Sequence, residues 1–153
     1  MSNNVATILT TAVQESAYLL NKDLDASSEE LCAQSLNDKC RSILSMVIEL
    51  TGFNLAVSKL LKGESVSYAD MKAPNAEAGL TEARANLAAS VATVCETIAT
   101  ISEDDWMTQV TAPWGAQITK AHAALWVSIH AMYHDGQINL IQVANGDTDV
   151  HWM

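Results

Sequence analysis

The chain of 153 residues has few basic side chains: eight lysines and arginines stand against 18 acids, which gives a net charge of −10. The bases are scattered along the sequence and form no cationic stripe. A surface of that sign repels the phosphate groups of nucleic acids and anionic lipids. Neither a nucleic acid nor a membrane is therefore an expected partner.

The sequence also lacks an uninterrupted apolar run of the roughly 18–20 residues that a membrane span needs. No basic residue precedes the apolar part of the N-terminal stretch MSNNVATILT, so a secretory signal is not predicted. These two absences lead us to expect a soluble cytoplasmic protein. Phosphate-binding glycine loops and nucleophile-elbow serines are missing as well, which argues against nucleotide-binding and serine-hydrolase sites.

Cysteine is scarce, with three residues spaced far apart: Cys32, Cys40 and Cys95. An odd number at such spacing excludes a simple disulfide framework and a zinc knuckle, and it favours a reducing compartment. We expect Cys40 and Cys95 to be small buried residues on helices.

What the sequence does have is helical periodicity. Hydrophobic residues make up 49% and charged residues 17%, the composition of a globular chain, and the length suits a single domain spanning 1–153. We predict an all-α fold, an up-down-down-up four-helix bundle with long connections and a short extended turn before the last helix. Its helices are expected over 5–20, 38–62, 80–101 and 121–145, with a short helical turn over 29–33 and an extended piece around Trp106, Thr108 and Val110.

Two histidines in the last helix are the candidate site. His130 and His134 are four residues apart, so on a helix they share one face with Cβ atoms about 5–6 Å apart. On the second helix, Glu49 falls beside an otherwise apolar face. Two histidines and one carboxylate, brought together in a bundle core, suit a divalent metal such as Fe(II), Zn or Ni.

A structural role accounts for the same residues. Each histidine can hydrogen-bond a backbone carbonyl, a hydroxyl or Glu49, and Glu49 can pair with Arg41, with Lys59 or with a histidine. Gly136 follows soon after His134 and costs helix propensity. Its presence indicates close approach of another backbone or a subunit, and the alternative is that the packing simply tolerates it.

Three stretches carry a resemblance to a known family. TAPWGAQITK, followed by HAMYHDGQINLIQVANGD, is similar to the turn and final helix of the DinB-like (damage-inducible, YfiT-like) four-helix bundles of bacteria. RSILSMVIELTGFNLAVSKLLKGE resembles their second helix. The resemblance implies a divalent metal site (nickel, zinc or iron) made by three histidines, of which His130 and His134 match the pair on the last helix.

The third family histidine is absent, because the position that looks equivalent is Met46, with Glu49 one turn on. A thioether is a poor ligand for a hard divalent ion, so either Glu49 substitutes or the site holds no metal. The resemblance also implies a homodimer and a metal-dependent transferase or isomerase that uses a low-molecular-weight thiol. The alternative is a non-enzymatic, metal-free bundle that binds a small molecule or a protein partner.

Overall fold

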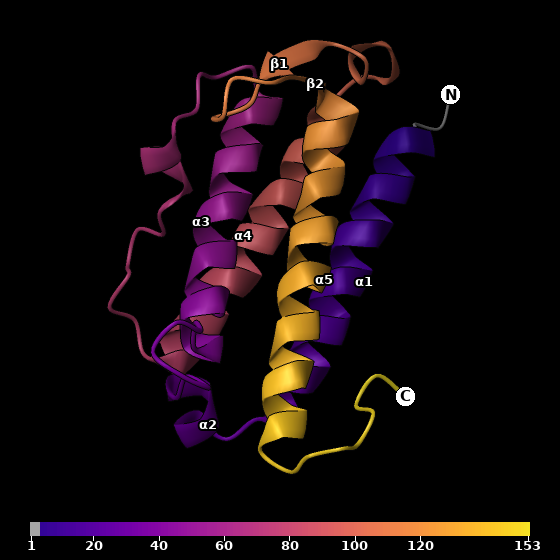
Figure 1. Ribbon diagram of the computed structural model, residues 1–153. Helices are drawn as coiled ribbons and strands as arrows, with labels where there is room; N and C mark the ends of the chain where they lie inside the picture. Colours follow the sequence, from indigo (N-terminus) through magenta and orange to yellow (C-terminus); the bar gives the residue numbers. More distant parts are fainter. Residues whose placement is uncertain (1–3) are drawn as a thin grey trace.

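The computed structural model describes residues 4–153 and shows a bundle of four long helices (Figure 1). These are α1 (Asn4–Ala26), α3 (Ile43–Leu61), α4 (Leu80–Thr100) and α5 (Lys120–Ala144). Helices α1 and α5 run in one direction, and α3 and α4 run in the other (Figure 1). The prediction of an all-α, up-down-down-up bundle is therefore confirmed.

Long connections make this order possible. The short helix α2 (Glu29–Ala33) lies between α1 and α3, and the 3-10 turn η1 (Tyr68–Met71) lies in the chain that returns from the end of α3 to the start of α4. A second 3-10 turn, η2 (Glu103–Asp105), follows α4. The short helical turn predicted at 29–33 is confirmed.

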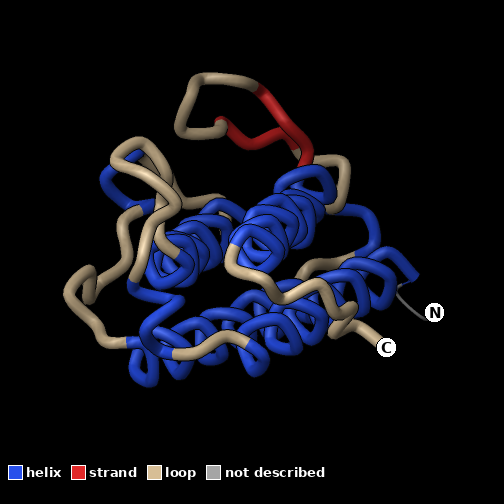
Figure 2. Tube along the Cα trace, turned by 60° about the horizontal axis from the view of Figure 1, so that its bottom comes forward, coloured by secondary structure: helices blue, strands red, loops and turns tan. Residues whose placement is uncertain are grey.

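A small hairpin caps one end of the bundle (Figure 2). Strand β1 (Gln109–Thr111) pairs antiparallel with β2 (Gln117–Thr119), with Val110 opposite Ile118. Gly115 turns the chain between them with a φ of +85°, a backbone conformation that glycine adopts without strain. The extended piece was predicted near Val110, whereas its pairing partner was not.

Helix boundaries differ from the predicted ones where polar side chains intervene. Helix α1 continues six residues past the predicted end at Leu20, because its last turns bury Asp23 and Leu24 instead of exposing a polar loop. Helix α3 begins at Ile43 and not near residue 38. The side chain of Asn37 accepts hydrogen bonds from the backbone of Lys39 and Cys40, which holds that segment in a turn.

The core is made of two clusters, one toward each end of the bundle. The cluster near the hairpin includes Trp106, and the other includes the end of α1. Among the helices that the structure describes, one, α3, is long and apolar enough to cross a membrane, but 67% of its apolar window is buried inside the bundle, as expected of a core helix. Helix α4 and the residue after it bury apolar side chains at regular helical spacing: Leu87, Val94, Ile98 and Ile101.

A close backbone approach occurs at Gly52; within the described chain none occurs at Gly136, where approach of a subunit stays a prediction. A Cβ atom at Gly52 would lie 2.5–2.6 Å from backbone atoms of Lys72 and Ala73, whereas one at Gly136 would meet no atom within 4 Å. The chain after η1 thus packs directly on α3.

Gly52→Ala is therefore expected to destabilise the fold by about 2–3 kcal/mol, the cost of overpacking a tight contact. Gly136→Ala is the matched control and should stabilise it by up to about 1 kcal/mol, because alanine is the better helix former. Urea unfolding of the two variants and the wild type measures both changes. Equal stability of Gly52→Ala and the wild type would contradict the contact.

Candidate metal centre

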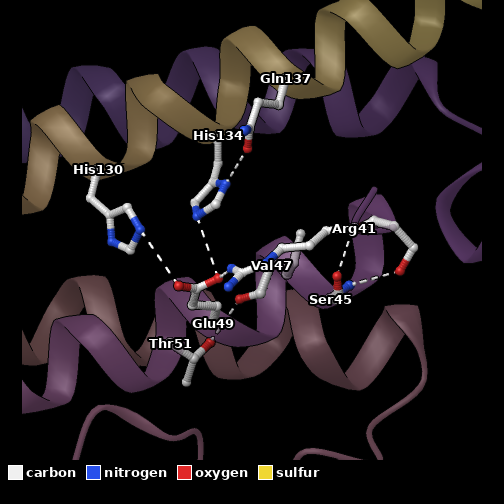
Figure 3. Close-up of polar contacts among 9 residues, drawn as sticks. Arg41, Ser45, Val47, Glu49, Thr51, His130, His134 and Gln137 are labelled. Carbon is white, nitrogen blue, oxygen red and sulfur yellow. Dashed lines mark hydrogen bonds and ion pairs between the residues drawn. The ribbon is translucent and has the colours of Figure 1, made fainter. Parts of the chain in front are cut away.

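The three predicted site residues meet on facing surfaces of α3 and α5 (Figure 3). Glu49 lies near the middle of α3, and His130 and His134 lie one turn apart on α5. One ligand atom from each residue can be chosen so that all three lie within 4.8 Å of one another. The structure therefore brings together the residues that the sequence singled out.

The carboxylate of Glu49 faces both imidazoles. Its Oε1 atom is 3.9 Å from Nε2 of His130, and its Oε2 atom is 3.6 Å from Nε2 of His134. These separations are too long for hydrogen bonds. They suit two ligands of one ion, since atoms held by bonds of about 2.1 Å can be up to about 4.2 Å apart.

Gln137 fixes the orientation of His134. Its Oε1 atom lies 2.7 Å from Nδ1 of His134, one turn along α5. When Nδ1 carries the proton and donates it to this oxygen, the lone pair of Nε2 faces Glu49. Metal-binding histidines are commonly oriented by an outer partner in this way. Sequence reasoning noted the Gly-Gln pair but assigned Gln137 no role, although its position three residues after His134 was the available signal.

Burial leaves the imidazoles neutral and with unused nitrogen atoms. His134 is 2% exposed, and neither its Nε2 atom nor Nδ1 of His130 has a hydrogen-bond partner among the described residues. Burial, together with the nearby His134 and Arg41, lowers the pKa of His130 to about 4. Burial likewise lowers the pKa of His134, against a smaller raising effect of Gln137. Uncharged imidazoles with free lone pairs are the form that binds a metal.

Two residues near Glu49, Arg41 and Met46, decide which atom is the candidate third ligand. Arg41 forms an ion pair with the Oε2 atom of Glu49, as one of the structural alternatives predicted. Met46 is 3% exposed and packs in the core cluster that includes the end of α1. Its thioether therefore serves packing, and the oxygen of Glu49 is the candidate third ligand.

The other two histidines and the cysteines lie outside this centre. His122 stacks on Trp126, with ring centroids 5.9 Å apart, and His151 contacts Asp147 at 3.0 Å. Cys40 is exposed in the loop before α3, so its predicted burial on a helix is wrong, while Cys95 is partly buried on α4.

Comparison with known proteins agrees with the geometry. No curated protein matches the chain. Residues 32–138, which are 107 of the 153 residues, match the DinB superfamily, and this stretch contains Glu49, His130 and His134. The match covers more than half of the chain and includes α3, α4 and most of α5, so the protein belongs to the DinB superfamily.

Proposed function

We propose that the protein binds one divalent metal ion through Glu49, His130 and His134, and that it is a metal-dependent transferase acting on a low-molecular-weight thiol. The observation that carries the proposal is the convergence of two neutral imidazoles on one carboxylate, with His134 already oriented by Gln137. A centre of two histidines and one carboxylate leaves coordination positions open, as a catalytic site requires.

A divalent ion held there would lower the pKa of a bound thiol, so that the thiolate is available as nucleophile at neutral pH. The chain's own residues supply the surroundings. Phe53 packs its ring against His130 with centroids 4.3 Å apart, which restricts the imidazole and excludes water from one side. Glu49 remains 32% exposed, so the centre is open to a small substrate.

One observation favours a second function, a metal-free bundle that binds a small molecule or a protein. The guanidinium of Arg41 already neutralises Glu49, and Met46 contributes no hard ligand. In that case the ion pair between Arg41 and Glu49 persists in the functional protein, and His130 and His134 contribute only to packing.

Metal analysis separates the two functions. The full chain is incubated with Ni²⁺, Zn²⁺ or Fe²⁺, desalted, and its metal content measured, with Glu49→Gln as the test variant and Glu64→Gln, an exposed acid beyond the end of α3, as the control. We expect about one equivalent in the wild type and Glu64→Gln, and much less in Glu49→Gln. A metal content of the wild type below about a tenth of an equivalent for all three metals would contradict the metal site and favour the metal-free function.

The thiol transferase is tested on the loaded protein with glutathione or cysteine and a chromogenic electrophile. We expect thiol conjugation that chelation abolishes and that readdition of the metal restores. Stoichiometric metal binding with no such conjugation for either thiol would contradict this activity while leaving the metal site intact.

A further inference from the structure

Arg41 reaches the metal centre from outside the helices. It lies in the loop just before α3, its side chain is 56% exposed, and Glu49 is eight residues further along the chain. Among the residues that the structure describes, Glu49 makes the one polar contact of the guanidinium (Figure 3). A single carboxylate thus holds the far end of a long, flexible side chain.

Arg41 and the candidate ion need the same oxygen. The Oε2 atom of Glu49 pairs with Arg41 and is also the atom that faces Nε2 of His134 at 3.6 Å. An ion between Glu49 and His134 would take that oxygen. Two cations on one carboxylate oxygen repel each other, and a divalent ion with two imidazole ligands is the stronger competitor.

A pocket of about 320 Å³ adjoins the guanidinium, between the loop before α3 and the second half of α5. Its wall is mainly apolar, with two cationic side chains and one amide. The lining residues that matter here are Leu36, Lys39, Arg41, Met46, Gln137 and Leu140. Two of the chain's eight bases therefore lie at one pocket of an otherwise acidic protein.

We propose that Arg41 competes with the cation for the carboxylate of Glu49. In the absence of metal its guanidinium neutralises Glu49. On metal binding it turns into the adjacent pocket, where with Lys39 it binds the carboxylate of a small organic acid. This inference rests on the proposed metal function and specifies its substrate. Guanidinium binds carboxylate through two parallel hydrogen bonds, and the apolar wall suits the remainder of such a molecule.

The proposal makes two ligands interdependent. While Arg41 holds Glu49, the cation site lacks a ligand and the pocket lacks a free guanidinium. Binding of either ligand removes part of the cost of binding the other. By thermodynamic linkage, the metal must then strengthen carboxylate binding by the same factor by which the carboxylate strengthens metal binding.

The competition is tested by titrating the full chain with Co²⁺ and following its visible absorption. The test variant is Arg41→Gln, and the control is Lys62→Gln, which removes an exposed charge at the far end of α3. We expect Arg41→Gln to bind Co²⁺ at least about 10-fold more tightly than the wild type, and Lys62→Gln to stay within about 2-fold. Circular dichroism checks that both variants fold.

Two failures of this titration are distinguishable. Wild type and Arg41→Gln binding Co²⁺ equally would overturn the role of Arg41 and leave the metal function standing. No Co²⁺ binding by any of the three proteins would overturn the metal function and this inference together.

The pocket is tested with hexanoate, using hexan-1-ol as the uncharged control, by calorimetry with and without Co²⁺. In the wild type we expect Co²⁺ to strengthen hexanoate binding about 5-fold or more and to leave hexan-1-ol unaffected. In Arg41→Gln the gain should disappear. A gain that persists in Arg41→Gln would mean that the carboxylate binds the ion directly, and no gain in the wild type would mean that no guanidinium is released; either result overturns the proposal.

Discussion

His134→Ala is expected to weaken Co²⁺ binding by more than about 100-fold. The substitution removes one of three ligands, and it is the one that Gln137 already orients toward Glu49. Changes to outer partners of metal ligands alone cost about 10–100-fold in affinity. Loss of the ligand itself should exceed that range, whereas Gln137→Leu should fall within it. Titration of the purified variants with Co²⁺ gives both values.

His122→Ala is the matched control for this series. His122 is an exposed imidazole on the same helix, stacked on Trp126 and outside the centre. The His122→Ala variant should bind Co²⁺ with the affinity of the wild type. If His134→Ala kept wild-type affinity while His122→Ala lost it, the metal would be bound elsewhere on α5, and the centre assigned here would be wrong.

The fold was predictable because periodicity reports the face that each helix buries. Helix α4 was predicted over 80–101 and spans Leu80–Thr100, since its apolar residues recur at regular helical spacing. The end of α1 was missed because Asp23 is polar in sequence and fully buried in the structure. Its surroundings explain the burial: the indole nitrogen of Trp152 donates a hydrogen bond to its Oδ2 atom at 3.0 Å. That contact joins residues 129 positions apart, which no local pattern reveals.

The candidate site was predictable for a different reason. Glu49 interrupts an apolar face, and an acid that is partly buried there needs a partner. Asp135 interrupts an apolar helix face in the same way and is fully buried, but its partner on α1 is distant in sequence. That Glu49 offers one oxygen, Oε2, to both Arg41 and His134 could not be predicted, because side-chain orientation across two helices depends on packing and not on spacing.

One face of α5 carries large hydrophobic side chains that the bundle does not bury. Leu125, Ile129, Tyr133 and Leu140 are 41–62% exposed. They form a stripe on the side of α5 away from the core. The homodimer stays a prediction, and this stripe is the surface on which it can be tested by measuring the molar mass in solution after Ile129→Glu.

Asp135→Asn is expected to stabilise the protein by about 2–4 kcal/mol at pH 8 and to have little effect at pH 4. Asp135 on α5 is fully buried, and so is the neighbouring acid Asp23 on α1. When Asp135 is protonated, it can share a hydrogen bond with the carboxylate of Asp23. Burial, and secondarily the charge of Asp23, raises the pKa of Asp135 to about 7. One pKa unit corresponds to about 1.4 kcal/mol, which sets the size of the effect.

The sign of the pH dependence follows from the number of protons bound by the folded and by the unfolded state. Between pH 4 and pH 7 the folded state holds a proton on Asp135 that the unfolded chain has released, so the stability that this group contributes falls as the pH rises through that window. His130 acts in the opposite sense, because its pKa of about 4 lies below its ordinary 6.5 and stability is lost as the pH falls through that range. The difference between Asp135→Asn and the wild type, measured by urea unfolding at each pH, cancels the histidine contribution. Asp149→Asn, an exposed acid, should show no such difference, and a pH-independent gain in Asp135→Asn would mean that Asp135 is charged throughout and paired in some other way.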